Sequence, residues 1–358
     1  MEIIDQRHTD SYAMYNGDTF EMIQNIPDNS IGYCIYSPPF NSLYQFSDSE
    51  RDMGNCESYE QFFEQYAYLI RDIHRALMPG RLTSAHVMNL PTSMQREGVI
   101  GLRDFRGDVI REHVGDEHAE FYVAMRRLKY RFILAEAESD YPRMLKLENA
   151  IDTMEEELRE HPGERGFVYH SEVCIWKCPV VAVTRSKALG LLNKQLVKDS
   201  SRSRQGIPDF VCTFRKVGDN PVPISGELDH FAGECFVQTG NLSIDIWQKY
   251  ASPVWMDVDQ SRTLNGRPGK DENDVKHICP LQLDVIHRCL QLWSKEGEVV
   301  LSPFAGIGSE GYESIKMKRK FIGFELKESY YKQAIRNLEL AQSEANEPSL
   351  FDAEMAAQ

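Results

Sequence analysis

The sequence predicts an α/β fold assembled from βαβ units. Residues 31–36 form an uninterrupted apolar run typical of a buried strand, and residues 59–77 repeat apolar side chains at helical spacing. Pro79-Gly80 is expected to end this helix, and residues 82–88 favour a second strand. Strands that alternate with helices in this way are typical of parallel sheets. At 358 residues and 42% hydrophobic content, the chain can bury one large core or two smaller ones.

The first strand leads into Ser37-Pro38-Pro39-Phe40, which carries the strongest chemical signal in the chain. The two prolines stop the strand and stiffen the turn, because proline fixes φ and removes a hydrogen-bond donor. The turn therefore offers a polar acceptor, a rigid carbonyl group and an aromatic face. Such a set can stack on a flat heterocycle while an exocyclic amine donates hydrogen bonds to the acceptor and the carbonyl. The tetrapeptide alone leaves a second interpretation open, a turn at a strand end with a packed phenylalanine.

A second candidate site lies near the other end of the chain. Residues 298–309 predict a short strand that runs into a glycine-rich turn, residues 310–317 predict a helix, and residues 321–325 predict a strand ending at Glu325. Glycines in such a turn let the backbone approach a ligand closely, and an acid at the next strand end can accept hydrogen bonds from both ribose hydroxyls. The pattern indicates a nucleoside-cofactor site. Both candidate sites fall just past the carboxyl ends of strands, where open α/β sheets bind ligands.

Two cofactors fit this second site. The spacing of Gly306, Gly308 and Gly311 also matches the fingerprint of NAD-binding proteins, with Glu325 as the ribose acid. However, Pro303-Phe304 places a bulky ring where a pyrophosphate-binding turn is usually lean, and S-adenosylmethionine carries no phosphate. Taken with the motif that ends at Phe40, the pattern favours S-adenosylmethionine, and an NAD oxidoreductase is the rival interpretation.

The two motifs together resemble the DNA amino-methyltransferases that act on N4 of cytosine or N6 of adenine, in the permuted order called the beta class. Residues 37–40 match the family's catalytic motif, residues 302–308 match its FxGxG cofactor motif, and Glu325 matches its ribose-binding acid. The combination is far more specific than any one of these matches.

Two further segments add to the resemblance. Gly17-Asp18 resembles the acidic motif on the strand before the catalytic one. Residues 277–282, followed by a helical stretch over residues 283–294, resemble the element that packs on the methionine end of the cofactor. The resemblance covers residues 12–110 and 250–340.

The resemblance implies a Rossmann-like, S-adenosylmethionine-dependent methyltransferase fold, with a mostly parallel seven-stranded sheet, one antiparallel strand and helices on both faces. It implies catalytic roles for Ser37, Pro38, Pro39, Phe40 and Asp18, and cofactor contacts from Ser302, Pro303, Phe304, Gly306, Gly308, Glu325, His277, Pro280 and Gln282. Ser302 departs from the family, which usually has an aspartate there that often contacts the methionine amino group. Neighbouring backbone or another acid would have to replace that contact.

The implied reaction is direct methyl transfer to the exocyclic amine of a base flipped out of DNA. Phe40 would stack on the base, Ser37 and the carbonyl of Pro38 would accept hydrogen bonds from the amine, and catalysis would come mainly from positioning. Within the family, serine at the first motif position leans towards N4 of cytosine. N6 of adenine is the alternative, and Asp18 would suit either amine. A methyltransferase for RNA or for a protein glutamine, and a catalytically silent DNA-binding protein, stay open as rivals.

The net charge of −15 is unusual for a protein that binds DNA, but the basic residues are unevenly placed. Nine lysines and arginines lie from Lys177 to Lys216, opposed only by Asp199 and Asp209. Residues 198–206 predict a flexible polar loop able to reach phosphates and base edges. We expect DNA contacts from Arg185, Lys187, Lys194, Lys198, Ser201, Arg202, Arg204 and Gln205. A solvated surface loop is the alternative, and the acidic remainder would keep the rest of the molecule off the duplex.

These observations divide the chain into five expected parts. They are residues 12–113 (first part of the methyltransferase domain with the catalytic motif), 114–163 (an inserted helical hairpin), 164–240 (the DNA-facing target-recognition region), 241–340 (second part of the methyltransferase domain with the cofactor motif) and 341–358 (a disordered tail). The hairpin would bind a partner, join two copies in a homodimer or act only as a spacer. Within the tail, Glu347-Pro348-Ser349-Leu350-Phe351 resembles the peptide by which bacterial enzymes dock on the replicative sliding clamp, although glutamine is usual in place of Glu347. A tail that folds back on the body is the alternative.

The composition argues against other classes of protein. No apolar run approaches ~18 residues, so we expect no transmembrane helix, and residues 1–5 do not resemble a signal peptide. The eight cysteines form no CxxC pair, which favours neither a zinc ribbon nor a disulfide framework. His170, Cys174 and Cys178 are evenly spaced but lie in a predicted strand, where packing is favoured over metal binding. We expect a cytoplasmic location in a prokaryotic or phage-infected cell, and double-stranded DNA as the partner.

Overall fold

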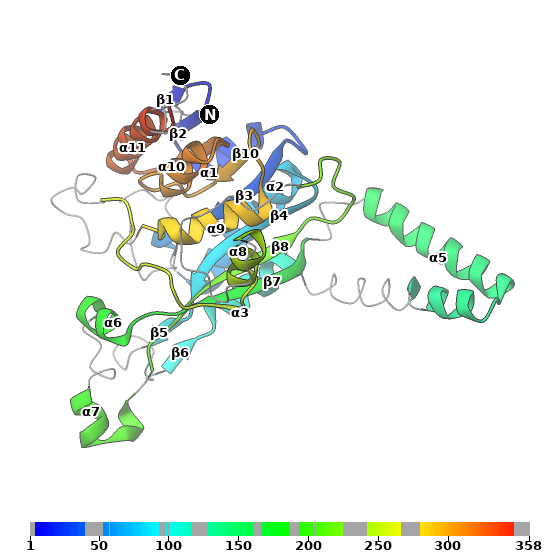
Figure 1. Ribbon diagram of the computed structural model, residues 1–358, viewed down its shortest axis with the longest axis horizontal. Coiled ribbons are helices and arrows are strands. Elements are labelled where there is room, and N and C mark those ends of the chain that lie inside the picture. Colours follow the sequence, from blue (N-terminus) through cyan, green and yellow to red (C-terminus); the bar gives the residue numbers. More distant parts are fainter. Residues whose placement is uncertain are drawn as a thin grey trace.

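The computed structural model describes residues 4–39, 53–56, 58–92, 98, 101–115, 128–129, 131–160, 166–186, 193–203, 205–224, 242–265 and 280–346. Within these ranges a sheet of nine strands forms the centre of the molecule (Figure 1). Its strands are β1 (Asp5–His8), β2 (Tyr12–Asn16), β3 (Ile31–Tyr36), β4 (Leu77–Met88), β7 (Val168–Ile175), β8 (Asp209–Arg215), β9 (Val254–Trp255), β10 (Val299–Ser302) and β11 (Lys320–Glu325). A separate pair of short strands comprises β5 (Leu90–Thr92) and β6 (Gly101–Arg103).

The described helices are α1 (Thr19–Met22), α2 (Tyr59–Ala76), α3 (Phe105–Val114), α5 (Tyr141–Glu160), α6 (Pro179–Ser186), α7 (Asn193–Lys198), α8 (Leu242–Tyr250), α9 (Leu283–Trp293), α10 (Ser309–Lys316) and α11 (Glu328–Asn346). Three short 3-10 helices are η1 (Ile23–Asn25), η3 (Met53–Asn55) and η5 (Ser200–Arg202). In the part of the chain that the structure describes, no helix is both long enough and apolar enough to cross a membrane.

The strand order is β1-β2-β11-β10-β3-β4-β8-β7-β9. Neighbours from β2 to β4 in this order are parallel, and β8 runs antiparallel between β4 and β7. The α/β class, the mostly parallel sheet and the single antiparallel strand among the seven central strands are therefore confirmed. The expected number of strands was wrong, because two short strands extend the edges. β1 forms an antiparallel hairpin with β2, and the two-residue β9 pairs with β7.

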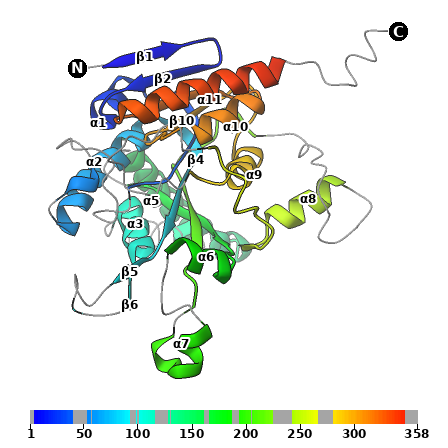
Figure 2. The ribbon, with the colours of Figure 1, turned by 90° about the vertical axis from the view of Figure 1, so that its left-hand side faces the viewer.

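Helices cover both faces of the sheet, as the alternation of side chains along β3 shows. Tyr33 and Ile35 enter a core cluster with buried residues of α9, α10 and α11. Cys34 and Tyr36 enter a second cluster with buried residues of α2 and α3. Because successive side chains of a strand point to opposite faces, the two clusters lie on opposite sides of the sheet. Figure 2 shows the same arrangement, with α11 and α10 in front of the strands and α2 to one side.

The junction between α2 and β4 differs from the prediction. The helix begins after Ser58, whose side chain accepts a hydrogen bond from Gln61 N, and it ends at Ala76. β4 then begins at once and includes Pro79 and Gly80, which we expected to separate the two elements. Gly80 adopts φ +71 and donates its N–H to the carbonyl of Lys216, so the Pro-Gly pair bends a strand instead of ending a helix.

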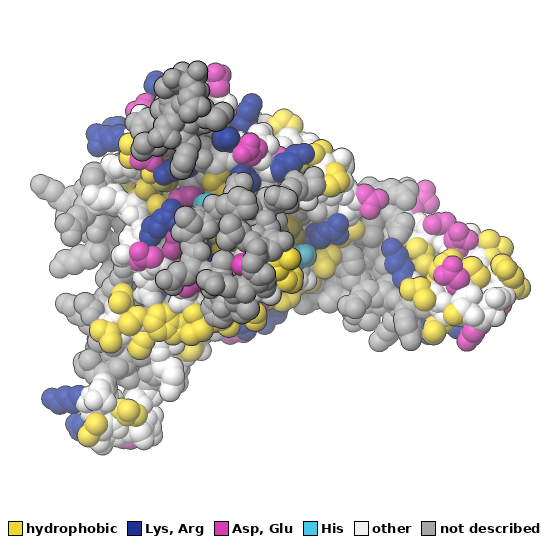
Figure 3. Space-filling model, in the orientation of Figure 1, with side chains coloured by type: hydrophobic (Ala, Val, Ile, Leu, Met, Phe, Trp, Pro, Cys, Tyr) yellow, Lys and Arg dark blue, Asp and Glu magenta, His cyan; other side chains and the backbone are white. Residues whose placement is uncertain are grey.

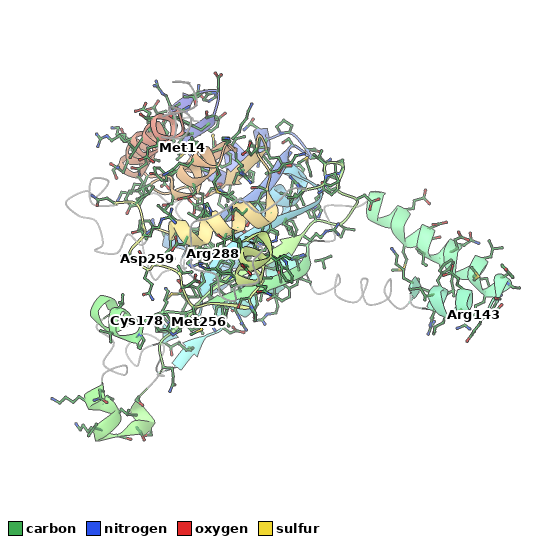
Figure 4. All side chains as sticks on the ribbon, in the orientation of Figure 1. Met14, Arg143, Cys178, Met256, Asp259 and Arg288 are labelled. Atoms are coloured by element: carbon green, nitrogen blue, oxygen red, sulfur yellow. The ribbon has the colours of Figure 1, made fainter. Side chains whose placement is uncertain are left out.

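Two peripheral segments stand out in the described chain. α5 projects from the body as an arm, with Arg143 near its far tip (Figures 1 and 4). α11 runs to Asn346 and buries Ala341 completely, so the expected disorder from residue 341 was wrong for the residues up to 346. The clamp-like peptide, residues 347–351, lies outside the described residues.

Candidate active site

The two sequence motifs meet at one edge of the sheet. β10 and β3 are parallel neighbours in which Leu301 lies beside Cys34. Adjacent strands are ~4.8 Å apart, so the turn after β10 and the prolines after β3 emerge side by side at the carboxyl edge. The chain leaves β10 towards β11 and leaves β3 towards β4 on the other side. This is a switch point of strand order, the place where open α/β sheets bind ligands.

The turn after β10 is organised around a carboxylate. Gly306 adopts φ +53, and its N–H donates to Oε2 of Glu325 at 2.8 Å. Oε1 of the same carboxylate accepts from the N–H of Lys327 at 2.8 Å. Among the described residues, a Cβ atom added at Gly306 would meet no other atom within 4 Å, so this part of the chain leaves space beside the backbone of Gly306. The turn and Glu325 thus form an open, acidic cradle that fits the hydroxyl groups of a ribose.

The other two glycines of the motif serve packing. Gly308 begins α10 in the left-handed region, with φ +85, and a Cβ there would lie 3.2 Å from Cβ of Ala334. A Cβ at Gly311 would lie 2.6 Å from atoms of both Leu338 and Phe321. These two positions let α10 approach α11 and β11 closely, whereas Gly306 is the position that leaves room for a ligand.

At two positions expected to contact the cofactor, a buried polar atom has no hydrogen-bond partner among the described residues. The hydroxyl of Ser302 is completely buried at the end of β10 and makes no hydrogen bond. Gln282 is buried at the start of α9, and its side-chain oxygen is likewise unsatisfied. Buried polar atoms are normally paired, so two orphans here fit a polar ligand such as the methionine end of S-adenosylmethionine. Pro280 precedes Gln282 and is half-buried, and His277 lies outside the described residues.

A buried acid beside the turn was missed by the sequence reasoning. Glu310 lies in the first turn of α10 and is only 4% exposed. Burial raises its pKa to about 8, and the charge of Glu325 adds to the effect. An acid in the first turn of a helix usually interacts with the helix dipole, so its sequence position alone did not mark it as part of this site.

The catalytic motif leads into a chain of hydrogen bonds. Oγ of Ser37 lies 3.0 Å from Nδ1 of His86, and Nε2 of His86 lies 3.1 Å from Oδ2 of Asp209. Nζ of Lys177 forms an ion pair with the same carboxylate. His86 and Asp209 are buried, whereas Ser37 is half-buried at the edge of the sheet.

Strand direction explains why these four residues meet. Ser37 follows β3 and Lys177 follows β7, while His86 lies near the end of β4. Asp209 is the first residue of β8, and because β8 is antiparallel its first residue pairs with Met88 near the end of β4. Sequence reasoning missed His86, Asp209 and Lys177 because Ser37 and His86 are 49 positions apart, and His86 and Asp209 are 123 apart. No local motif connects them.

Asp209 is held in its ionised form. Its burial would raise the pKa, but His86 and Lys177 beside it outweigh that effect, and the pKa is lowered. When a neutral His86 donates Nε2–H to this carboxylate, its Nδ1 is an acceptor. In that tautomer Ser37 donates its hydroxyl proton to His86, and the lone pairs of the Ser37 oxygen stay available for a substrate donor.

An aromatic contact joins the two halves of the site. The ring of Phe304 in the cofactor turn lies 6.0 Å from the ring of Tyr36, the last residue of β3. The Tyr36 hydroxyl is hydrogen-bonded to that of Tyr66 on α2 at 2.8 Å, and this contact holds the Tyr36 side chain in place. Pro303 and Phe304 thus lie in the turn after β10, and their contact with the cofactor stays a prediction. Phe40 lies outside the described residues, so its stacking role stays a prediction.

Asp18 is not brought to Ser37. It precedes α1, and its Oδ1 accepts from the N–H of Phe20 at 2.9 Å. It follows β2, which is separated from β3 by β11 and β10. Gly17 donates its N–H to the carbonyl of Glu325, so Asp18 lies on the cofactor side of the edge and not beside the catalytic motif.

The expected target-recognition region, residues 164–240, is partly built into the sheet. β7 and β8 are central-sheet strands, and the chain between them contains α6, α7 and η5. This connection leaves the end of β7 and returns to the start of β8, so both its ends lie at the edge that carries Ser37. Figures 1 and 2 show α7 standing clear of the strands.

The predicted DNA contacts are only partly described. Lys194 and Lys198 are exposed on α7, and the expected flexible loop instead continues as the end of α7 and η5. Ser201 donates its N–H and hydroxyl to Oδ1 of Asp199, which stabilises that turn, and Gln205 follows it. The side chains of Arg185, Lys187, Arg202 and Arg204 lie outside the described residues.

Two residues of the basic window face elsewhere. Arg215 is the last residue of β8 and Lys216 follows it, so both lie at the opposite edge of the sheet. The amino group of Lys216 is buried, donates to Asn29 Oδ1 at 2.8 Å and to the carbonyl of Leu77 at 2.7 Å, and has a pKa lowered by burial to about 8. Lys216 therefore stabilises the start of β4 and does not belong to a DNA-facing surface.

Comparison with known proteins agrees with this geometry. The N6_N4_Mtase family, described as DNA methylase, matches residues 191–336. Type II methyltransferase M.BglI of Bacillus subtilis is 22% identical over 338 residues, which cover 91% of this chain and 85% of that protein. Type II methyltransferase M.BglII of Bacillus subtilis is 35% identical over 67 residues, which cover 19% of this chain and 17% of that protein.

Two solved structures share the fold. TTHA0409 from Thermus thermophilus, solved in complex with S-adenosyl-L-methionine, has a TM-score of 0.54 at 17% identity, covering 92% of this chain and 93% of that chain. The PvuII DNA methyltransferase, which is cytosine-N4-specific, has a TM-score of 0.53 at 14% identity, covering 96% of this chain and 95% of that chain. At these identities the likeness concerns the fold.

The central sheet has the Rossmann-like α/β fold of these two structures, and the two sequence motifs lie at its carboxyl edge. Residues 191–336 are similar to the DNA methylase family, and this similarity indicates S-adenosylmethionine as the cofactor.

Proposed function

We propose that this enzyme methylates N4 of cytosine at specific sites in double-stranded DNA, after flipping the cytosine out of the duplex. The supporting observation is the meeting of two motifs at one edge of the sheet. Gly306 lies in the turn after β10 and donates its N–H to Glu325 at the end of β11. Ser37 and its prolines follow β3, the parallel neighbour of β10. A cofactor methyl group and a target amine would therefore lie next to each other, which is the main requirement for direct transfer.

The residues of this chain would divide the work as follows. When bound, S-adenosylmethionine supplies an electrophilic methyl group. Glu325 would accept hydrogen bonds from its ribose, and the unsatisfied oxygens of Ser302 and Gln282 would pair with its polar methionine end. Ser37 Oγ and the carbonyl of Pro38 would accept hydrogen bonds from the exocyclic amine of the base, holding its nitrogen towards the methyl group.

The choice of cytosine rests on Ser37. In the family that this chain resembles, serine at the first position of the catalytic motif leans towards N4 of cytosine. Ser37 would also be a neutral acceptor, since its hydroxyl can donate its own proton to Nδ1 of a neutral His86. It can therefore receive an N–H of the amine without an additional charge in the pocket.

DNA would approach from the carboxyl edge. The connection between β7 and β8 begins and ends at that edge and carries the exposed Lys194 and Lys198. Lysines contact phosphates and position a duplex, while base edges and shape supply the specificity. The duplex would then lie across the edge from which Ser37 is reached by a flipped base.

Mass spectrometry of nucleosides tests this proposal. Unmethylated DNA would be incubated with the purified protein and S-adenosylmethionine and then digested. N4-methylcytosine is the expected product. N6-methyladenine would support the DNA amino-methyltransferase activity but contradict the choice of cytosine. If neither methylated base appears under conditions where S-adenosylmethionine binds, the proposal is contradicted.

A further inference from the structure

We propose that Ser37, His86 and Asp209 form a proton relay that takes up the proton released from the target amine when it is methylated. This inference rests on the proposed function and adds two residues to it, neither of which belongs to a sequence motif. His86 and Asp209 would not touch the base. They would act through Ser37, as positioning residues that also carry a proton.

The first argument is connectivity. Oγ of Ser37 is 3.0 Å from Nδ1 of His86, and Nε2 of His86 is 3.1 Å from Oδ2 of Asp209. Both distances are within hydrogen-bonding range. His86 is 8% exposed and Asp209 is 2% exposed, so Ser37 is the more accessible end of the chain, at the edge where the substrate amine would lie.

The second argument is direction. Asp209 also pairs with Lys177, which together with His86 favours its ionised form. An ionised Asp209 requires the proton of neutral His86 to be on Nε2, so Nδ1 can only accept. The Ser37 hydroxyl then points its proton at Nδ1. Its oxygen is left as the acceptor for an N–H of the base, and the path for a proton runs from the base to His86.

The bonds balance without a further reactant. The amine nitrogen forms a bond to the methyl carbon, whose bond to the donor sulfur breaks with its electron pair left on sulfur. The nitrogen then loses one N–H proton to Ser37 Oγ, as the Ser37 hydroxyl proton passes to Nδ1 of His86. The result is a methylated neutral amine, an unchanged serine and a protonated His86 between Ser37 and the Asp209 carboxylate. Proton loss to solvent after product release restores the neutral ring.

Several other groups surround the relay. On β7, the thiol of Cys174 has a raised pKa, first through burial and in part through the charges of Glu172 and Asp209. Arg106 of α3 lies over the ring of Phe210, next to Asp209, and pairs with Glu172 at 3.2 Å. These neighbours pair mainly with each other, so among the described residues Lys177 is the charged side chain that contacts the relay directly.

The experiment measures the rate of a single methyl transfer to DNA at several pH values, with saturating S-adenosylmethionine. The wild-type rate should fall at acid pH, because a protonated His86 cannot accept a proton. His86→Asn keeps a polar atom near the position of Nδ1 but cannot carry the proton onward. Its rate should drop by roughly 10²-fold, which is the lower end of what a positioned base contributes. The fall in rate at acid pH (the acid limb of the pH profile) should also disappear.

Two further variants separate a relay from a structural role. Asp209→Asn should slow transfer and move the acid limb to lower pH, because the carboxylate no longer stabilises a protonated His86. In the Ser37→Ala background, His86→Asn should cause little additional loss, since both changes break the same path. Binding of S-adenosylmethionine, measured by calorimetry, and the melting temperature should stay near wild type if the variants are correctly folded.

The outcomes are distinguishable. A His86→Asn enzyme that is slow but keeps the wild-type pH dependence would show a positioning role only and would overturn the relay. The relay would also be overturned if the rate loss of the double variant equals the product of the losses of Ser37→Ala and His86→Asn measured separately. If His86→Asn does not fold, the Asp209→Asn enzyme decides: a fall in rate at the same acid pH as in wild type would overturn the relay. A wild-type enzyme that leaves DNA unmethylated would remove the proposed function and the relay together.

Discussion

At the scale of single residues, the cofactor side of the site contains buried polar groups whose burial costs stability. Ser302 has a buried hydroxyl without a hydrogen bond, and Glu310 is a carboxyl group buried where its ionised form is poorly solvated. In a folded chain such groups reduce stability, and they are retained where a ligand uses them. Each one gives a prediction in which stability and ligand binding respond differently.

Ser302→Ala should weaken S-adenosylmethionine binding without destabilising the protein. The variant removes a hydroxyl that no described residue satisfies, so the melting temperature should be unchanged or slightly higher. A neutral hydrogen bond contributes ~0.5–1.5 kcal/mol, so the dissociation constant for S-adenosylmethionine, measured by calorimetry, should rise by roughly 2- to 10-fold. Ser314→Ala is the matched control, because that buried hydroxyl already donates to the carbonyl of Glu310. Equal affinities in all three proteins would exclude Ser302 as a cofactor ligand.

Glu310→Gln should remove a pH dependence of stability. The folded pKa of Glu310 is raised to about 8 from 4.5, so between these values the unfolded chain ionises while the folded one stays protonated. Wild-type stability should therefore fall as the pH rises through this window, at up to ~1.4 kcal/mol per pH unit. The glutamine variant cannot ionise and should gain on wild type by a few kcal/mol at pH 8 and hardly at all at pH 5, as measured by urea unfolding without cofactor.

The control for this comparison is Glu344→Gln. Hydrogen bonds from Lys316 and Tyr312 lower the pKa of Glu344, so its contribution is present above about pH 4.5 and is lost as the pH falls. Its replacement should therefore destabilise the protein slightly at neutral pH, the opposite sign, with a small size because the pair is partly exposed. A Glu310→Gln profile parallel to wild type would contradict the burial argument.

At the scale of elements, the turn between β10 and α10 separates binding from packing. Its glycines have different surroundings although they lie within six positions of one another. Gly306 borders open space, while Gly311 is pressed against side chains of α11 and β11. The same substitution at the two positions should therefore damage different properties.

Gly306→Ala should abolish or strongly weaken cofactor binding while leaving the fold largely intact. Its φ of +53 costs a non-glycine residue ~1 kcal/mol, and the new methyl group would occupy the open cradle beside Glu325. Gly311→Ala should instead lower the melting temperature, because its Cβ would lie 2.6 Å from atoms of Leu338 and Phe321 and overpacking costs ~1–3 kcal/mol. Melting curves and cofactor titrations of both variants test the pair. A Gly306→Ala protein that binds S-adenosylmethionine normally would contradict the placement of the cofactor.

The elements that could be predicted are those whose side chains carry the pattern. β3 is buried at all six positions, so its apolar run marked it clearly. β1 is exposed at all four positions, and β9 has only two residues, so neither has a pattern to detect. The local motifs also located Ser37 and Glu325. His86, Asp209 and Lys177 were not predictable, because their meeting depends on strand order and on the reversed direction of β8.

At the scale of the whole molecule, acidic and basic side chains are mixed over the body, but two exposed lysines lie together on α7. The net charge is −15, and acidic side chains mark the projecting arm in Figure 3, whereas lysines appear at α7. Both Lys194 and Lys198 are exposed on α7, which belongs to the connection at the catalytic edge. An acidic protein can bind DNA when its cations are collected at one place and its remaining surface repels the duplex.

Lys194→Ala combined with Lys198→Ala should therefore weaken DNA binding and reduce its dependence on salt. Each phosphate contact contributes about −0.9 to the slope of log K against log salt concentration, so losing two contacts should make the slope less steep by about 2. Fluorescence anisotropy with a labelled duplex would measure this slope at salt concentrations between roughly 50 and 200 mM. Lys332→Ala is the matched control, since Lys332 is equally basic and exposed but pairs with Glu328 on α11. If the double variant keeps the wild-type slope, or if Lys332→Ala changes it as much, DNA does not lie along α7 and the duplex must approach the catalytic edge over another surface.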